Sequence, residues 1–508
     1  MTNISKLLDR NTDSLDNIVL AEEFVVQRMI RNCSPFQPLP TLVVIKASIF
    51  LFFVKLLEKV AREKLYIKNA QRELHLVDSR LRTILNSLIA KNIVYGWDLL
   101  SNYPDAPAVI RYGVYLKLTG PVLGNTYNAE GFGVANDKNA ALLIAVAEAL
   151  ERQSAYIWNP SVIVKGSFDT LKDTHNLVWM DLFSEKQKAE DEKMNVSKNS
   201  IVGWAPAVGI HNNKKYLLPA QMVYVLYGNE NLKEPIFTDS STSGVAAGAS
   251  FEHAACQALC ELVERDALMG FWLNKIPPPL IDPNTIESKD IRQKISTLKK
   301  YKFELYILDI TSDIKIPTFC AVLRDPTGEV PVSMSAVADF DKNHALEKLI
   351  LEISKFAHYR ADENTYSKNG SDISNYLDIF TMPERRHVWT QKNMFHEIDF
   401  FLQGEKKDFS SIQDRKDILT YKKKLEEVKK LLKQKGMDGY LAEVTSKEAN
   451  SVGLRVVRAV VPDLIPIHFS EKRKHLGVSR LYEFPVLLRI STERSSEDTI
   501  NNTPHPFL

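Results

Sequence analysis

A repeated acidic pentad is the strongest chemical signal in this sequence. The segment E-A-L-E-R at residues 148–152 returns as E-L-V-E-R at residues 261–265. On a helix, glutamates three residues apart share a face, and an arginine at i+4 lies beside the first glutamate. One such pentad is usually a solvated salt-bridge face. Two copies, each in the second half of an alanine-rich helix, suggest instead two related halves that face one site.

The flanking residues predict that these carboxylates are buried. Both pentads are surrounded by alanine, leucine, valine and cysteine, and a helix that is apolar nearly all round is buried. Buried carboxylates need compensating charge, which arginines supply in part and divalent cations would complete. The expected metal ligands are Glu148, Glu151, Glu261 and Glu264. All-oxygen ligation favours Mg²⁺ or Mn²⁺ over zinc, and Mg²⁺ usually shares its shell with phosphate oxygens, which points to a nucleotide.

Two segments rich in small residues carry weaker signals. No Walker A sequence is present, and Gly131-Phe132-Gly133 lacks the third glycine of a dinucleotide fingerprint, so it indicates only a tight turn. The run S-T-S-G-V-A-A-G at 241–248 has two interpretations. It allows either close approach of the backbone to a phosphate before a helix N-terminus, or tight packing of a helix on a strand.

His253, Cys256 and Cys260 share one helical face and resemble part of a metal site. Zinc would need a fourth ligand. Small buried cysteines in a core helix are the commoner arrangement, and we favour that interpretation.

The elements that must position the pentads are helices and strands in mixed order. Apolar spacing and composition predict helices at 139–156, 250–272, 344–359 and 417–433. Strands are predicted at 106–116, 303–310, 318–323, 439–444 and 453–461, and two strands around a turn at 203–227. Leu81, Leu85 and Leu88 recur at helical spacing within a mostly helical region, residues 1–90. This order predicts an α/β (α+β) architecture rather than a bundle or a sandwich.

Composition bounds the class of protein. The chain has 508 residues, 44% of them hydrophobic and 25% charged, as in an ordinary soluble protein. Lys and Arg total 65 against 63 Asp and Glu, which argues against nucleic acid as a partner held by bulk charge. Four cysteines cannot form a disulfide framework, so a reducing compartment is expected.

The N-terminal region shows no secretory signal, because acidic residues stand in residues 1–20. The most apolar stretch, residues 42–57, is interrupted by Lys46 and Lys55 and is shorter than a membrane span. We interpret it as a buried helix or a dimer face, and expect a cytoplasmic protein. At the other end, residues 493–502 are polar, and the alternate prolines Pro504 and Pro506 stiffen the terminus. Such an end suits insertion into a cleft, although a disordered end is the commoner outcome.

Five segments together resemble the YcaO family. In chain order they are 130–152, 204–226, 241–272, 336–352 and 443–481. The sequence is most similar to the azoline-forming cyclodehydratases that modify ribosomally made peptides, the thiazole/oxazole-modified microcin type known from bacteriocin biosynthesis. The resemblance covers about residues 85–508. It implies a YcaO domain at 81–490, an N-terminal helical docking or dimer region at 1–80, and a flexible tail at 491–508.

The resemblance also implies a chemistry and a set of roles. Members bind ATP with Mg²⁺ and convert Cys, Ser or Thr of a precursor peptide to thiazoline or oxazoline. Nucleotide-contacting residues carry over to Arg152, Gln257, Arg265 and Glu352, and the metal ligands to the four pentad glutamates. A tail with Pro504, Pro506 and the Leu508 carboxylate is implied to reach the active site and assist proton transfer. Partners of this type are an E1-like leader-binding protein and, in some systems, a flavin-dependent dehydrogenase; homodimers also occur.

Departures from the family pattern keep alternatives open. The sequence has Phe132 for a usual lysine, Ile144 for serine, His253 for glutamate, Lys355 for glutamine and Leu508 for a third proline. All four pentad glutamates are intact, which favours a working site. The alternatives are another YcaO reaction, such as thioamide or amidine formation, and a non-catalytic scaffold subunit.

Overall fold

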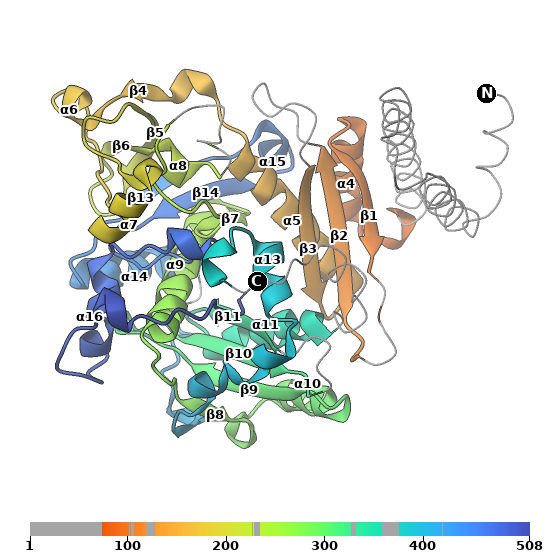
Figure 1. Ribbon diagram of the computed structural model, residues 1–508. Helices are drawn as coiled ribbons and strands as arrows, with labels where there is room; N and C mark the ends of the chain where they lie inside the picture. The colour runs from red at the N-terminus through yellow and green to blue at the C-terminus, as the bar shows by residue number, and fades with distance from the viewer. Residues whose placement is uncertain are drawn as a thin grey trace, which may run out of the picture. The chain divides into compact units, whose positions relative to one another are not determined.

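In the part of the chain that the structure describes, the fold combines helices with three β-sheets (Figure 1). The computed structural model describes residues 74–100, 102, 106–117, 128–225, 227, 234–326, 332–357, 375–418 and 420–507. The mixed helix and sheet architecture confirms the predicted fold class. The predictions for residues 1–73, including the apolar stretch 42–57 and most of the N-terminal region, lie outside the described residues.

The sheets are built from short strands. The first has the order β1-β2-β3, with β1 (Val94–Leu99), β2 (Ile110–Lys117) and β3 (Asn128–Ala135). The second has the order β11-β10-β9-β8-β12, with β8 (Leu280–Asp282), β9 (Glu304–Asp309), β10 (Thr318–Arg324), β11 (Val332–Ala338) and β12 (Lys406–Asp408). The third has the order β4-β5-β13-β14-β7, with β6 paired to β5; its strands are β4 (Val164–Gly166), β5 (Val202–Gly209), β6 (Lys215–Pro219), β7 (Val245–Gly248), β13 (Tyr440–Glu443) and β14 (Arg455–Val460).

Helices cover these sheets and carry the pentads. The longer ones are α4 (Ser79–Ala90), α5 (Lys138–Tyr156), α9 (Phe251–Leu273), α10 (Lys289–Lys300), α11 (Lys342–Ser354), α14 (Tyr421–Gln434) and α16 (Ser479–Leu487). Shorter helices are α6 (Phe168–Leu171), α7 (Glu185–Glu190), α8 (Ala220–Val223), α13 (Met382–Val388) and α15 (Lys447–Ser451). The helices predicted at 139–156, 250–272, 344–359 and 417–433 are confirmed as α5, α9, α11 and α14. Among the described residues, no helix is both long and apolar enough to cross a membrane.

The predicted turn at Gly131-Phe132-Gly133 is wrong, because these residues lie within β3. The glycines serve close packing of α5 on this strand. A Cβ atom on Gly131 would lie 2.2 Å from the Ala145 carbonyl oxygen, and one on Gly133 would lie 1.9 Å from the Ala141 carbonyl oxygen. Only glycine allows the backbones to approach so closely.

Three strand–helix units share one geometry. In β3–α5, β7–α9 and β11–α11, a capping side chain follows the strand and starts the helix: Asp137, Ser250 and Asp341, respectively. Each helix also packs against the strand of the next unit, α5 on β7, α9 on β11 and α11 on β3. These six elements surround the end of the chain in Figure 1. The predicted two related halves are thus two of three similar units.

The flexible tail predicted for 491–508 is wrong for residues 500–507. The indole N–H groups of Trp272 and Trp389 donate to the carbonyl oxygens of Thr503 and Pro504, both at 3.0 Å. Phe507 forms a parallel bridge to Met334 of β11. The segment is fixed because its backbone carbonyls and its side chains have partners in the core. Leu508 lies outside the described residues.

We expect Gly133→Ala to destabilise the protein by about 3 kcal/mol or more, because the added methyl group meets helix backbone that cannot move aside cheaply. Gly453→Ala is the matched control. Gly453 has φ +81° and nothing within 4 Å of the added Cβ, so only backbone strain of about 1–2 kcal/mol is expected. Denaturant unfolding measures both. Equal losses for the two variants would contradict the packing argument.

Candidate active site

The first glutamate of each pentad is held in the same way. Glu148 accepts the Phe132 backbone N–H at 2.5 Å and pairs with Arg152 at 2.7 Å. Glu261 accepts the Gly244 backbone N–H at 3.1 Å and pairs with Arg265 at 2.9 Å. In both cases one carboxylate oxygen accepts a backbone N–H of its own unit, from β3 for Glu148 and from the turn just before β7 for Glu261, and the other oxygen binds the arginine one turn ahead. The predicted helical geometry of the pentad is therefore confirmed in detail.

The second glutamate of each pentad reaches the next unit. Glu151 on α5 accepts the Ala247 N–H of β7 at 2.7 Å. Glu264 on α9 accepts the Ala338 N–H of β11 at 3.1 Å and also pairs with Arg265. These two carboxylates therefore join consecutive units, and they place both pentads around one centre.

Negative charge accumulates between α5 and α9. Burial, followed by repulsion from Glu261 and then Glu148, raises the pKa of the Glu151 carboxyl well above its usual range. The hydrogen bond from Ala247 and the charge of Arg152 oppose this rise without cancelling it. A buried acid with such a pKa beside other carboxylates is a functional candidate, because a bound cation would restore its ionised form.

The third unit contributes Glu352 on α11. Its carboxylate pairs with the Lys355 ammonium at 2.6 Å. Burial alone would raise the pKa of Glu352, but Lys355, Lys348 and Arg265 together lower it. Arg265 and Glu352 thus act on each other across two units, and the structure brings the predicted residue Glu352 to the pentad site. Lys348, which our sequence analysis did not select, adds positive charge one turn before Glu352.

The remaining predicted site residues lie around these helices. Arg152 also donates to the Glu130 carbonyl oxygen at 2.7 Å. Gln257 is half-buried, one turn before Glu261 on α9. Pro504 and Pro506 are buried in the fixed tail, which places the Phe507 ring 4.3 Å from the Arg265 guanidinium carbon. The tail therefore approaches Arg265 of the second pentad.

The residues considered for zinc have other contacts. The His253 ring stacks on Tyr421 with a centroid distance of 3.7 Å, and its Nδ1 accepts the Ala249 N–H at 3.3 Å. Cys256 and Cys260 are buried in the core between α9 and α14. Within the part of the chain that the structure describes, no three His, Cys, Asp or Glu side chains form a ready-made metal cluster. These contacts support the packing interpretation of the histidine and cysteines.

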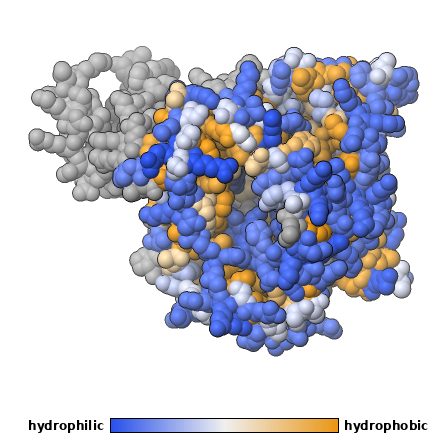
Figure 2. Space-filling model, turned by 180° about the vertical axis from the view of Figure 1, so that it is seen from behind, coloured by the Kyte–Doolittle hydropathy of each residue, from blue (hydrophilic) through white to orange (hydrophobic). Residues whose placement is uncertain are grey.

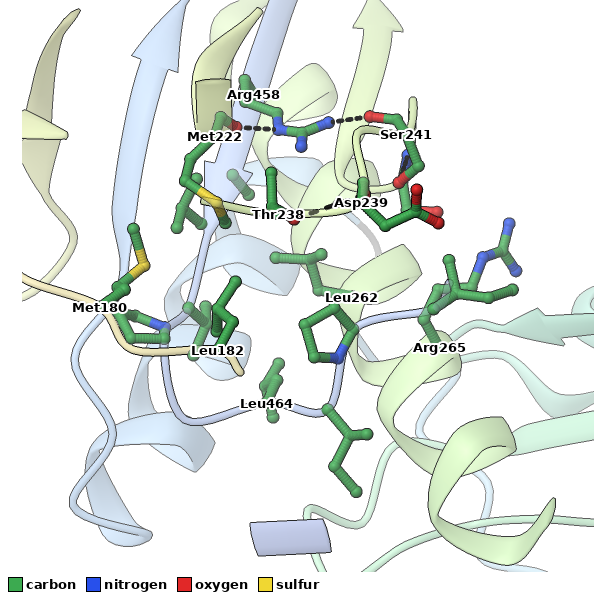
Figure 3. A pocket seen from close by; sticks show the side chains of 18 residues that line it. Met180, Leu182, Met222, Thr238, Asp239, Ser241, Leu262, Arg265, Arg458 and Leu464 are labelled. Atoms are coloured by element: carbon green, nitrogen blue, oxygen red, sulfur yellow. Dashed lines mark hydrogen bonds between the residues drawn. The ribbon is translucent and has the colours of Figure 1, made fainter. Parts of the chain in front are cut away.

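Sequence reasoning missed Arg458, a buried residue of β14. Its Nε donates to the Met222 carbonyl and its Nη1 to the Ser241 carbonyl, both at 2.8 Å (Figure 3). Burial lowers the pKa of this guanidinium to about 10, while the charge of Glu261 opposes the shift. By holding the turn at 241–244, Arg458 fixes the Gly244 N–H that binds Glu261. The sequence carries one signal that could have identified Arg458, a basic residue within the apolar run V-V-R-A-V.

A cavity of about 50 Å³ lies between Arg458 and the pentad helix α9. Apolar side chains, among them Met180, Leu182 and Leu464, form much of its wall (Figure 3). Thr238 and Asp239 also line it, and Leu262 and Arg265 bound it on the α9 side. Its volume suits one or two waters or a single small side chain.

Comparison with protein families agrees with this geometry. Residues 132–465 match the family model described as YcaO cyclodehydratase, ATP- and Mg²⁺-binding. The chain belongs to the YcaO family. The matched range contains both pentads, Glu352 and Arg458, and it lies within the domain predicted at 81–490.

Individual relatives of this YcaO chain are distant. An uncharacterised protein in the tfuA 3′ region of Rhizobium leguminosarum bv. trifolii is 28% identical over 197 residues, which are 38% of this chain and 44% of that protein. A structure titled heterocyclase in complex with substrate and cofactor has a TM-score of 0.65 and 20% identity; the match covers 85% of this chain and 57% of that one. The YcaO structure from Methanopyrus kandleri bound with AMPPCP and Mg²⁺ has a TM-score of 0.57 and 17% identity, covering 78% and 92%. The chain thus spans about half the length of the first relative and of the heterocyclase, and the structural matches show a shared fold.

We expect Glu151→Gln to stabilise the nucleotide-free YcaO protein above about pH 4.5. Folding raises the pKa of the Glu151 carboxyl, so this group binds its proton more tightly in the folded protein than in the unfolded protein. The free energy of unfolding therefore falls as the pH rises from 4.5 through the raised pKa. Glutamine has no carboxyl to ionise, so the variant avoids this loss of stability. The gain in free energy of unfolding should therefore increase with pH and then level off.

Denaturant unfolding between pH 4 and 8 measures this gain. Glu443→Gln, an exposed glutamate paired with Arg455, is the control and should leave the stability nearly unchanged. A Glu151→Gln variant that loses stability across this pH range would contradict the charge accumulation.

Proposed function

We propose that this YcaO protein is an ATP-dependent cyclodehydratase that converts Cys, Ser or Thr of a ribosomal precursor peptide to thiazoline or oxazoline. The observation that carries the proposal is the convergence of three strand–helix units on one acidic centre. Two of these units carry the pentads, and the third carries Glu352.

The four pentad glutamates fit a role as Mg²⁺ ligands. Each already binds a backbone N–H, which fixes its orientation, and a carboxylate oxygen retains a second lone pair for a metal. The absence of a ready-made three-carboxylate cluster among the described residues is consistent with Mg²⁺, because this ion is usually held by one or two carboxylates together with phosphate oxygens and waters. Arg152, Gln257 and Arg265 would contact the nucleotide, and Glu352 would complete the site on the third side.

The proposed reaction removes one water from the peptide for each azoline ring. The thiol or hydroxyl of the substrate residue attacks the preceding amide carbon, and the amide oxygen accepts the γ-phosphoryl group of ATP. That oxygen leaves as inorganic phosphate, with ADP as the second product, and the amide nitrogen and the attacking atom each lose a proton. Bound Mg²⁺ offsets the charge on the transferring phosphoryl group.

The residues of this chain would orient and enclose these reactants. Arg265 is held by two pentad glutamates on one side and lies against the Phe507 ring on the other. Its guanidinium is therefore pre-organised toward phosphate, to which arginine presents a rigid donor fork. The tail with Pro504 and Pro506, and Leu508 beyond it, would border the reacting peptide and assist proton transfer.

The proposed complex includes the precursor peptide and a separate E1-like leader-binding protein. The resemblance to azoline-forming YcaO proteins, which work with such partners, supports this composition of the complex. Residues 1–80 would provide the docking or dimer surface, and a flavin-dependent dehydrogenase would act after ring formation.

A scaffold role is the second candidate because of Phe132 and Ile144. Their side chains are 41% and 45% exposed, and Ile144 stands one turn before Glu148 on α5. Two apolar groups beside the acidic centre would suit a surface that binds peptide without phosphorylating it. The intact hydrogen bonds of all four pentad glutamates favour the enzyme.

Binding of a non-hydrolysable ATP analogue tests the proposed site. We expect Mg²⁺-dependent binding by the wild type, weakened at least about 100-fold in Glu264→Gln, because the lost charge is one that the metal requires. Calorimetry measures the affinity, and circular dichroism checks the fold. Glu443→Gln should bind like the wild type. No binding by the folded wild type, even with its partner and precursor peptide present, would exclude the enzyme and leave the scaffold.

Phe507→Leu tests the role of the tail. Leucine keeps most of the buried volume but removes the aromatic face beneath Arg265, so we expect turnover to fall about tenfold while the unfolding free energy falls by less than about 1.5 kcal/mol. Phe395→Leu is the matched control, because it removes the ring that Arg324 contacts at 3.9 Å elsewhere in the fold. Equal turnover in the two variants would contradict a role for the tail in the reaction.

A further inference from the structure

The third unit of the site follows the register of the other two. Glu148, Glu261 and Glu352 each stand eleven residues after the capping residue of their helix, from 137 to 148, 250 to 261 and 341 to 352. Their side chains are 29%, 27% and 26% exposed, respectively. Glu352 therefore repeats both the register position and the exposure of the first glutamate of each pentad.

The units differ at the position three residues later. The first two have Glu151 and Glu264, and the third has Lys355. Each of those glutamates accepts a backbone N–H from the strand of the following unit. An ammonium group has only donors and cannot make this bond. Lys355 instead turns back to Glu352 on its own helix, at 2.6 Å.

This exchange changes the distribution of charge around the centre. The first two units each carry two glutamates and one arginine, and so each keeps one net negative charge. The third carries Glu352 and Lys355, with Phe356 in the place of the arginine. The charges at these positions cancel, and Lys348 on the same helix adds further positive charge beside Glu352. The lowered pKa of Glu352 and the raised pKa of Glu151 agree with this asymmetry.

We propose that the Lys355 ammonium is a permanent cation at the third corner of the site, occupying the place of a divalent metal ion. Divalent ions are then held only where the first two units meet, and Lys355 faces the nucleotide phosphates directly. The lysine side chain is 31% exposed. The inference rests on the proposed function, because it concerns how the same site balances the charge of a nucleotide.

Counting bound Mn²⁺ tests the inference. Full-length protein with a saturating non-hydrolysable ATP analogue is titrated with Mn²⁺, and electron paramagnetic resonance gives the number of ions bound per chain. The key variant is Lys355→Glu, which we expect to bind one more Mn²⁺ per chain than the wild type. Equal numbers in the two proteins would overturn the proposal.

The milder variant Lys355→Gln keeps the test decisive if charge reversal prevents folding. It removes the fixed cation, so we expect the Mg²⁺ concentration for half-maximal nucleotide binding to rise about tenfold, with affinity restored at saturating Mg²⁺. An unchanged Mg²⁺ dependence would overturn the proposal.

A second lysine provides the control. Lys294 on α10 pairs with Asp290 at 2.8 Å and with Glu347 of α11 at 3.5 Å, away from the register position of Lys355. Lys294→Glu and Lys294→Gln should leave the Mn²⁺ count and the Mg²⁺ dependence unchanged. If the wild type binds no nucleotide at all, the proposed function fails instead, so the two failures are distinguishable.

Discussion

The candidate active site depends on one kind of interaction, a helical glutamate that accepts a backbone N–H from a neighbouring strand or from the turn that leads into it. Glu151 and Glu264 make this bond across unit boundaries, and Glu148 and Glu261 make it within their units. A charge-assisted bond to a rigid backbone fixes a carboxylate more firmly than a bond to a flexible side chain does. The strands must therefore lie within hydrogen-bonding reach of the helices, which explains why small residues line these contacts. The hydropathy of one face of the molecule is shown in Figure 2, where polar side chains surround a hollow that apolar patches border.

Because these bonds gather carboxylates around one centre, the site lowers the stability of the fold. Carboxylates are gathered with fewer cations than their charge requires, and Glu151 shows the consequence in its raised pKa. Elsewhere buried acids are matched: Asp266 and Asp313 share Arg480, and Glu471 contacts Arg385 and Lys474. The contrast separates acids whose charge the chain itself neutralises from acids that we propose a ligand would neutralise. A protein can tolerate such a local loss because the surrounding core stabilises it.

Much of this site could be predicted from the sequence because its signals are local. The pentads stand on helices whose alanine and leucine pattern is strong, and the spacing of glutamate and arginine sets the side chains on one face. The strands β3 and β7 escaped prediction because glycine and alanine replace the β-branched residues that usually mark a strand. The third unit was missed because only Glu352 repeats a residue of the pentad, whereas Lys355 stands where the second glutamate would be. Arg458 and the fixed tail depend on contacts between distant segments, which no window of sequence contains.

The bonds between units also bear on how the protein folds. Glu151 and Ala247 are separated by 96 positions, and Glu264 and Ala338 by 74. Closing such long loops slows folding relative to chains with local contacts. No single strand–helix unit contains all the side chains that we propose bind the nucleotide. ATP would therefore bind only after the units have docked, so it would act on the folding equilibrium late, by trapping the assembled state.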